Sequence, residues 1–221
     1  MSEPSRTPAR WGPDDVAAAW AVPFFAGPEL PWSDWAMRPS AISLVVDEMR
    51  GGRRALVELG SGASTVVLAR AARELGARIV SVEHDRVWAE EIRRLLRRER
   101  LDVGTIVDAP LAELDPVALA VPSEPMLRAP RVWYELAEVL GACPELIELL
   151  VVDGPSAADE PDVLIRAPAL PALRDRLAEE CTIVLDDVSR PAERRTAELW
   201  RHELGCELEL TDTGVAVLRR R

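Results

Sequence analysis

The amino-acid sequence predicts an α/β protein with a doubly wound, mostly parallel sheet of seven strands, preceded by an N-terminal helical and aromatic arm. Short apolar runs alternate with amphipathic helical stretches, as in consecutive βαβ units. Several of these runs end at glycines or acids, which is where a parallel sheet binds its ligands. The last two runs flank the turn Asp212-Thr213-Gly214, which predicts an antiparallel hairpin at one edge of the sheet.

Residues 1–39 are predicted to form an arm or lid, and residues 40–221 the main domain. The arm is rich in proline and tryptophan, and the large aromatic rings need a surface to bury against. One short helix is expected in the arm, from Pro13 to Ala21. The main domain opens with a helix that begins at Ser40 and ends at the glycine pair Gly51-Gly52.

The first half of the domain predicts three strands separated by two helices. Gly76 is a stop signal for the first of these helices, and Asp85 can cap the second. The second helix carries an apolar stripe on one face and arginines on the other. In chain order, we expect strand Arg54–Leu59, helix Ala63–Leu75, strand Arg78–Glu83, a helix over 86–100 and strand Val103–Val107.

The second half predicts four more strands and two long loops. Residues 110–130, which contain five prolines, and residues 154–165 are predicted as loops, and we interpret both as elements of substrate specificity. In chain order, the expected elements are helix Tyr134–Leu140, strand Leu146–Val152, helix Pro171–Ala178, strand Thr182–Leu185, helix Pro191–Leu204, and strands Cys206–Leu210 and Val215–Leu218.

Composition and charge exclude several classes of protein. The chain contains no lysine, asparagine or glutamine, which excludes P-loop phosphate binding, Schiff-base chemistry and amide readout of adenine. The net charge of −11 argues against a nucleic-acid partner. No apolar run approaches the ~20 residues of a membrane span, so no membrane partner is expected. With no signal-peptide pattern, and with Cys143, Cys181 and Cys206 read as buried thiols, we expect a cytoplasmic protein.

The clearest motif is the segment Glu58-Leu-Gly-Ser-Gly-Ala-Ser-Thr65, a glycine loop between a strand and a helix. Gly60 and Gly62 are expected to allow positive φ and a close approach to the backbone, although a tight βα turn is the simpler alternative. Thr65 stands where a dinucleotide fingerprint requires its third glycine. Glu83 ends the next strand, where a carboxylate can accept from both hydroxyls of a ribose. The two signals together predict a nucleoside ligand.

Four segments at strand ends together resemble the successive motifs of class I S-adenosylmethionine-dependent methyltransferases. The segments are Glu58-Leu-Gly-Ser-Gly, Val82-Glu-His-Asp, Val152-Asp-Gly-Pro and Leu185-Asp-Asp. The resemblance covers residues 40–221, with Ser64 in place of the last glycine of the first motif. It implies the strand order 3-2-1-4-5-7-6, with strand 7 antiparallel.

The resemblance also implies which residues hold S-adenosylmethionine. The glycine loop would hold its methionine part, Glu83 its ribose, and Asp108-Ala109 would border the adenine. His84 would lie near the adenosine, with a surface histidine as the alternative. The complete predicted cofactor site consists of Glu58, Gly60, Ser61, Gly62, Ser64, Thr65, Glu83, His84, Asp108, Ala109 and Asp153.

Asp153, Asp186 and Asp187 end two neighbouring strands and are expected to converge. Close carboxylates repel one another, and a hard divalent cation relieves that repulsion. The pattern is similar to that of metal-dependent O-methyltransferases, which implies Mg²⁺ or another divalent cation on these three acids. In the alternative, Arg166 and Arg190 are their counter-ions.

We therefore expect an S-adenosylmethionine-dependent methyltransferase that methylates a hydroxyl of a small molecule or sugar, with or without a metal. Asp153 is the predicted catalytic residue, as base or metal ligand. Trp32, Trp35 and Arg166 are predicted to contact the substrate, although the tryptophans also suit a hydrophobic clasp. A nicotinamide-dependent oxidoreductase and a non-catalytic nucleoside-cofactor-binding protein are the alternative functions. A small-molecule acceptor is the expected partner, and a homodimer is left open.

Overall fold

The computed structural model describes residues 11–115, 121, 126–156 and 160–220. Within these ranges, seven strands form one sheet in the order β3-β2-β1-β6-β7-β9-β8. The sheet is parallel from β3 to β7, and β9 is antiparallel to both of its neighbours. The predicted fold class and strand order are therefore confirmed. Across the sheet, the strands are β3 Gly104–Asp108, β2 Arg78–Glu83, β1 Ala55–Leu59, β6 Ile147–Val152, β7 Leu177–Leu185, β9 Ala216–Arg219 and β8 Glu207–Leu210.

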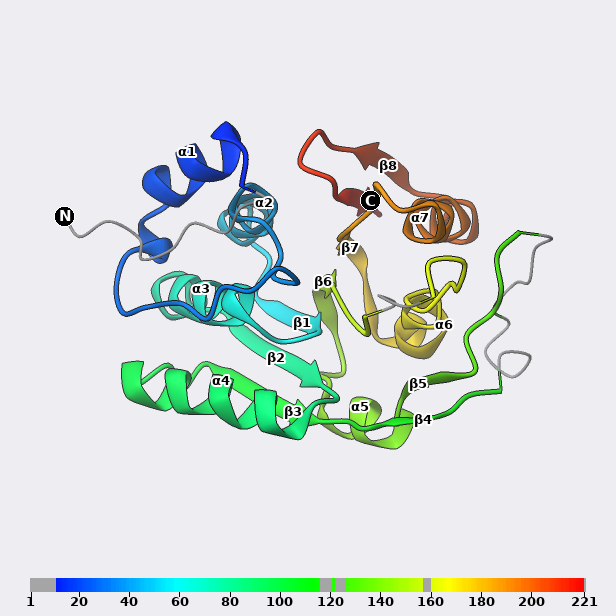
Figure 1. Ribbon diagram of the computed structural model, residues 1–221, viewed down its shortest axis with the longest axis horizontal. Helices are drawn as coiled ribbons and strands as arrows, with labels where there is room; N and C mark the ends of the chain where they lie inside the picture. The colour runs from blue at the N-terminus through cyan, green and yellow to red at the C-terminus, as the bar shows by residue number, and fades with distance from the viewer. Residues whose placement is uncertain (1–10, 116–120, 122–125, 157–159, 221) are drawn as a thin grey trace.

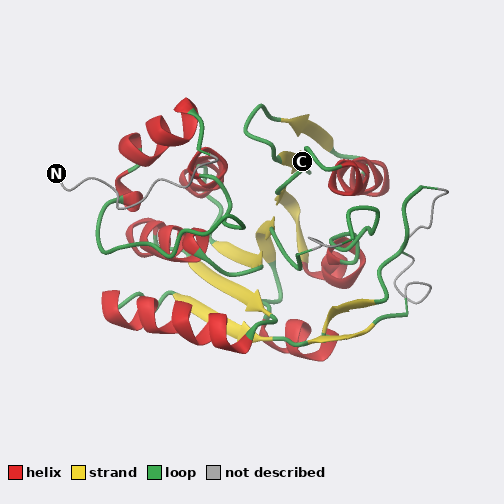
Figure 2. Cartoon of the chain, in the orientation of Figure 1, coloured by secondary structure: helices red, strands yellow, loops and turns green. Residues whose placement is uncertain are grey.

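Helices cover both faces of the sheet and make a three-layer molecule (Figures 1 and 2). Alternate residues of a strand point to opposite faces, so Leu56 packs in one hydrophobic cluster while Val57 packs in the other. The first cluster joins the sheet to α2 Pro39–Arg50, α3 Ala63–Leu75 and α4 Arg86–Glu99; the second joins it to α5 Leu136–Ala142, α6 Ala169–Leu173 and α7 Pro191–Leu204.

Local sequence signals explain where several helices begin and end. The side chain of Asp85 accepts hydrogen bonds from the backbone N–H groups of Val87 and Trp88, which caps α4 as expected. Gly76 adopts φ of 69° directly after α3, a left-handed conformation that favours glycine and stops the helix. These caps fix the ends of the strands that precede and follow each helix.

The described part of the arm packs on α2 and α3. It contains α1 Pro13–Ala21, as predicted, and a 3₁₀ turn at Pro23–Phe25. The carboxylate of Asp15 accepts a 2.5 Å hydrogen bond from Ser40 Oγ. The buried guanidinium of Arg70 pairs with Glu99 and donates to two carbonyl oxygens of the arm. Residues 1–10 lie outside the described ranges, and the division of the chain at residue 39 stays a prediction.

The predicted loop over 110–130 is wrong at its start. β4 Leu111–Glu113 pairs antiparallel with β5 Val132–Tyr134, so Tyr134 ends a strand and does not begin a helix. Pairing between strands so far apart leaves no local periodicity to detect. Residues 116–120 and 122–125 of the predicted loop, and 157–159 of the loop over 154–165, lie outside the described ranges.

The helix expected over Pro171–Ala178 is also corrected. α6 ends at Leu173, a 3₁₀ turn covers Arg174–Arg176, and β7 already begins at Leu177. Leu177 is buried and pairs with Ile147 at the start of β6, so tertiary pairing overrides the helical propensity of this segment.

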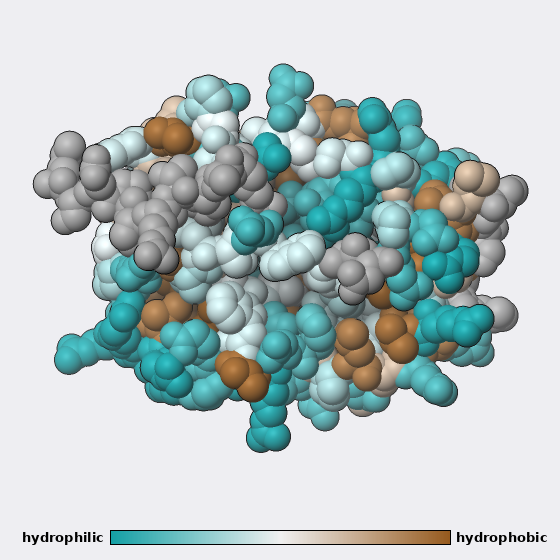
Figure 3. All heavy atoms as spheres, viewed as in Figure 1, coloured by the Kyte–Doolittle hydropathy of each residue, from teal (hydrophilic) through white to brown (hydrophobic). Residues whose placement is uncertain are grey.

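The surface is predominantly polar on the face that Figure 3 shows, where hydrophobic residues lie in small groups among hydrophilic ones. None of the helices within the described ranges has both the length and the apolar character needed to cross a membrane. Of the cysteines, Cys143 and Cys181 are buried as predicted, whereas Cys206 is half-buried.

Candidate active site

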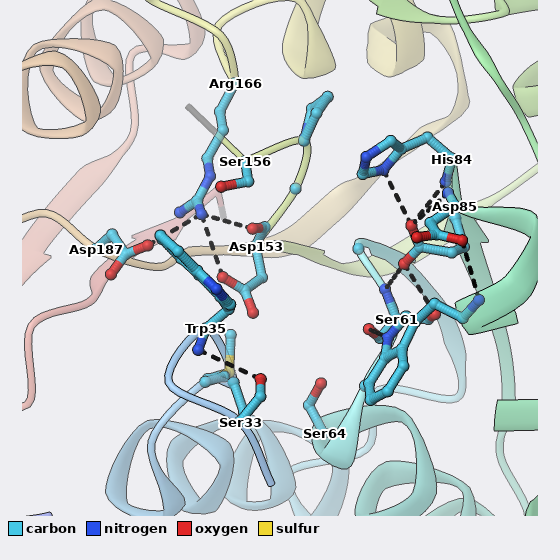
Figure 4. A pocket seen from close by; sticks show the side chains of 18 of the residues that line it. Ser33, Trp35, Ser61, Ser64, His84, Asp85, Asp153, Ser156, Arg166 and Asp187 are labelled. Atoms are coloured by element: carbon cyan, nitrogen blue, oxygen red, sulfur yellow. Dashed lines mark hydrogen bonds and ion pairs between the residues drawn. The ribbon is translucent and has the colours of Figure 1, made fainter. Parts of the chain in front are cut away.

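A cavity of about 340 Å³ lies at the carboxyl ends of β1, β2 and β6, within the usual size range of ligand pockets. Figure 4 shows that its labelled side chains form two groups, one around Asp153 and Arg166 and the other around His84 and Ser61. We name these groups the acidic end and the glycine-loop end. The glycine-loop end is lined by Gly60, Ser61, Gly62, Ser64, Glu83 and His84, and the acidic end by Asp153, Arg166, Asp187 and Arg190.

Two glycines let the carboxyl ends of β1 and β6 approach each other closely. Gly60 has φ of +93°, and a Cβ on it would lie 2.9 Å from the backbone nitrogen of Gly154. A Cβ on Gly154 would lie 2.3 Å from the hydroxyl of Tyr134. Gly62 differs from the prediction, because its φ of 176° is extended backbone that any residue adopts. Nothing lies within 4 Å of its Cβ position, so the space before Gly62 is open to a ligand.

Glu58 lies beneath the glycine loop and does not line the cavity. It is fully buried and accepts hydrogen bonds from Ser64 Oγ and Thr65 Oγ1, both at 2.6 Å, and from Ser81 Oγ at 2.5 Å. Burial raises the pKa of the Glu58 carboxyl, and the three hydroxyl donors offset part of that rise. Glu58 and Thr65 therefore support the loop from below, and their predicted contact with the cofactor stays a prediction.

The carboxylate of Glu83 accepts five hydrogen bonds at the glycine-loop end. One oxygen accepts from the backbone nitrogens of His84 and Asp85 and from His84 Nδ1, and the other accepts from Ser61 N and Oγ, all at 2.8–2.9 Å. Burial would raise the pKa of Glu83, but these hydrogen bonds outweigh it and hold the pKa below its usual range. Two of the five donors, Ser61 Oγ and His84 Nδ1, belong to side chains that can rotate away.

Asp108 and Ala109 are not brought into the cavity lining. Asp108 forms a 2.5 Å ion pair with Arg93 on α4, and Ala109 is buried with its N–H bonded to the Glu83 carbonyl. Their predicted place beside the adenine stays a prediction.

The structure brings Asp153, Asp186 and Asp187 together as predicted. One carboxylate oxygen from each lies within 4.8 Å of the others. Asp187 has φ of +62°, a conformation uncommon for a residue with a side chain, and its carboxylate points toward Arg166 in Figure 4. Asp186 is buried and does not line the cavity.

A buried guanidinium contacts two of these three carboxylates. Arg166, which is 3% exposed, reaches Asp187 Oδ2 at 3.0 Å and Asp153 Oδ1 at 3.2 Å through one nitrogen, Nη2. Arg190 Nη1 adds a second contact to Asp187, at 3.1 Å. The spacing of the oxygens suits a cation, but two of the three carboxylates are bound to arginine, so the residues present do not fit a divalent metal.

The electrostatics of Asp153 are opposite to those of Glu83. Burial, followed by the negative charge of Asp186, raises the pKa of the Asp153 carboxyl well above its ordinary value, and Arg166 only partly opposes this. A carboxyl group of this kind holds a proton more readily than an exposed one.

The two tryptophans predicted to contact substrate are separated. Trp35 lines the cavity and is 61% exposed. Trp32 packs edge-on against Trp11, with ring centroids 4.8 Å apart, and stacks on Phe25 at 6.2 Å. Trp32 is therefore part of the hydrophobic clasp that was its alternative.

Tyr134 lines the cavity, although the sequence did not decide whether it belongs to the core or to a pocket. It is 2% exposed, its hydroxyl has no hydrogen-bond partner among the described residues, and it lies against Gly154. A buried hydroxyl without a partner is costly, so a ligand in the cavity is the natural group to bind it. Only the pairing of β5 with β4 brings Tyr134 here, and no local motif could have revealed it.

Fold and cavity together define an α/β enzyme of the doubly wound class, with its ligand site at the carboxyl ends of the parallel strands. Residues 57–188 match the family described as a methyltransferase domain. This is more than half of the chain, so the chain belongs to that family. The match confirms the resemblance that the four motifs indicated and favours methyl transfer over the two alternative functions.

Solved structures with the same fold are also methyltransferases. An SAH-bound methyltransferase of Podospora anserina has a TM-score of 0.58 and 14% identity, covering 96% of this chain and 89% of that one. An O-methyltransferase of Bacillus cereus, in complex with SAH, has a TM-score of 0.54 and 17% identity, covering 96% and 93%. A methyltransferase of Pyrococcus furiosus has a TM-score of 0.56 and 12% identity, covering 94% and 96%. No curated protein matches the chain.

Proposed function

We propose that this chain is an S-adenosylmethionine-dependent O-methyltransferase that acts on a hydroxyl of a small molecule or sugar. The observation that carries the proposal is the shared cavity, in which a hydrogen-bond acceptor of lowered pKa, Glu83, and a carboxyl of raised pKa, Asp153, line one space. The solved structures bound to SAH support the choice of cofactor, and the O-methyltransferase among them supports an oxygen acceptor.

The glycine-loop end has the chemistry to hold the cofactor. The open space before Gly62 admits a ligand close to the backbone. Ribose hydroxyls would replace Ser61 Oγ and His84 Nδ1 on Glu83, since these two donors can rotate away while the backbone donors stay. Bound S-adenosylmethionine would supply an electrophilic methyl group on a sulfonium. No further step is required of this end.

The acidic end has the chemistry to bind and activate an acceptor. Asp153 would take the proton of the acceptor hydroxyl while the oxygen forms its bond to the methyl carbon. The cofactor would supply the methyl group, and the electron pair of its carbon–sulfur bond would stay on sulfur. Trp35 at the cavity lining offers an aromatic face to a phenol or sugar. The sequence also left metal assistance open. Two of the three candidate metal ligands, Asp153 and Asp187, are bound to arginine. A small-molecule partner, a homodimer and a cytoplasmic location stay predictions.

Methyl transfer to a panel of phenols, sugars and amines tests the proposal. The donor is S-adenosylmethionine with a labelled methyl group, and parallel reactions contain EDTA or Mg²⁺. We expect label in a phenol or sugar hydroxyl. Transfer to amines alone would reject the oxygen acceptor, and tight binding of NAD without binding of S-adenosylhomocysteine would reject methyl transfer.

A further inference from the structure

We propose that the guanidinium of Arg166 takes the place of a divalent cation at the acidic end, so that this methyltransferase works without a metal. The catalytic part of this inference rests on the proposed O-methylation. Its structural part, a preformed guanidinium–carboxylate centre, depends only on the contacts of Arg166.

Arg166 lies where a divalent cation would have to bind, and it therefore excludes one. Its Nη2 lies 3.0 Å from Asp187 Oδ2 and 3.2 Å from Asp153 Oδ1, and it is drawn between these two acids in Figure 4. Both acids belong to the set of three that could hold a metal. A cation bound to the same oxygens would stand close to a positive charge that cannot be removed, because arginine stays protonated.

Backbone contacts hold this guanidinium in place. Nη1 donates to the Asp186 carbonyl oxygen at 2.9 Å, and Nη2 donates to the Asp153 carbonyl oxygen at 2.5 Å. The neighbours Leu164 and Ala167 are buried in a hydrophobic cluster, which fixes the segment that carries Arg166. Swinging Arg166 away would break its ion pairs with Asp153 and Asp187, whose side chains are only 13% and 23% exposed, and such a change is unfavourable.

A second arginine also occupies one of the candidate ligand atoms. Arg190 Nη1 lies 3.1 Å from Asp187 Oδ2, the same oxygen that Arg166 Nη2 contacts. Asp186, the third candidate ligand, is buried and does not line the cavity, so the two acids that face the ligand space are the two bound to arginine. Sites for hard divalent cations in proteins use unpaired carboxylates, carbonyls and water.

Arg166 is on this view a positioning residue. It holds the carboxylate of Asp153 through Oδ1 and the main chain of both strand ends through their carbonyl oxygens. In these contacts Arg166 orients the carboxylate of Asp153, as a bound metal would. Its positive charge also reduces the repulsion among the three clustered carboxylates.

Titration with Mn²⁺, followed by electron paramagnetic resonance on the full chain with S-adenosylhomocysteine, tests the centre without any acceptor. The wild type is expected to bind Mn²⁺ no tighter than about 1 mM. Arg166→Met, which removes the charge but keeps bulk, is expected to bind Mn²⁺ at least about tenfold more tightly. Arg166→Lys, which keeps a cation, is expected to show no gain. Arg174→Met is the matched control, because Arg174 pairs with Glu203 on the surface.

Two outcomes would overturn the inference. The first is micromolar Mn²⁺ binding by the wild type that Asp186→Asn abolishes. The second is methyl transfer that stops in EDTA and returns with Mg²⁺. Either outcome can occur while the protein remains an O-methyltransferase. If no hydroxyl of the acceptor panel is methylated, O-methylation is rejected, but the Mn²⁺ titration still tests whether Arg166 replaces a metal. If Arg166→Met does not fold, the wild-type and Arg166→Lys titrations decide it.

Discussion

The two ends of the cavity stabilise their acids in different ways. At the glycine-loop end, Glu83 is supplied by backbone and side-chain donors of residues 84 and 85, directly beside it, and of Ser61 on the neighbouring loop. At the acidic end, Asp153 and Asp187 share Arg166, which is 13 and 21 residues away in the chain. The two arrangements differ in their chemistry: Glu83 is held by hydrogen bonds, two of them from Ser61, which is 22 residues away, whereas Asp153 and Asp187 are held by ion pairs to one buried arginine.

The difference has a chemical consequence. Hydrogen bonds from His84, Asp85 and Ser61 lower the pKa of Glu83 despite its burial, which suits a permanent acceptor for hydroxyl groups. Burial and neighbouring acids raise the pKa of Asp153 against the opposing effect of Arg166, which suits a group that takes up a proton. Two carboxyl groups whose environments push their pKa values apart are typical of a site that both binds and reacts.

The largest expected effect is at the acidic end. Asp153→Asn should lower turnover by at least about 100-fold, because general-base catalysis contributes that much. Affinity for S-adenosylhomocysteine, measured by calorimetry, should stay close to that of the wild type. The matched control is Asp162→Asn, an exposed acid paired with Arg128. Full turnover by Asp153→Asn would show that Asp153 is not the general base, and the proposed functional difference between Asp153 and Glu83 would be rejected.

A second change tests the glycine-loop end. Glu83→Gln should weaken the binding of S-adenosylhomocysteine by about tenfold or more, because it removes charge-assisted hydrogen bonds. Calorimetry measures the affinity. The control is Glu91→Gln, at an α4 side chain that is 40% exposed, pairs with Arg94 and does not line the cavity. An unchanged affinity would show that Glu83 serves only to hold the loop and that the ribose binds elsewhere.

Much of the fold could be predicted from the sequence because its signals are local. The helix Pro191–Leu204 and the strand Arg78–Glu83 have the predicted bounds, since proline, glycine and hydrophobic periodicity mark them. β4, β5 and the start of β7 were missed. Each of these depends on pairing with a strand distant in sequence, and such pairing overrides local propensity.

The same distinction holds within the site. Gly60, Glu83 and Asp153 were found because they end strands of one sheet, and topology alone brings such ends together. Glu58 carries a recognisable motif position, and the motif contains two of its hydroxyl donors, Ser64 and Thr65, but it does not show that their hydroxyls point back to a buried Glu58. The contact of Arg166 with two acids was left as an alternative, because sequence cannot show which of several arginines reaches a buried carboxylate.

Tyr134 lines the same cavity, against Gly154 and with its ring centroid 6.2 Å from that of His84, and it provides a test of smaller effect. Its hydroxyl has no partner within the described ranges, so Tyr134→Phe should leave the melting temperature unchanged or slightly higher. If a ligand binds the hydroxyl, affinity for S-adenosylhomocysteine or the KM of the acceptor should worsen by about three- to tenfold. A lower melting temperature with both constants unchanged would assign Tyr134 to packing alone.

The smallest expected effect concerns His84, which shares Glu83 with the cofactor on the proposed assignment. The hydrogen bond to Glu83, aided by the charges of Glu83 and Asp85, raises the pKa of His84 above 6.5. A raised pKa in the folded state means that the interaction stabilises the fold below pH 6.5 and is lost as the pH rises through the folded-state pKa. His84→Ala should therefore lower the melting temperature at about pH 6 and have no effect at about pH 9.

Because the side chain of His84 is partly exposed, this change in melting temperature should be small. The control His202→Ala, at an exposed histidine, should show no change. Binding of S-adenosylhomocysteine should be kept, because His84 Nδ1 leaves Glu83 when ribose arrives; a marked loss of affinity would instead place the imidazole against the adenosine.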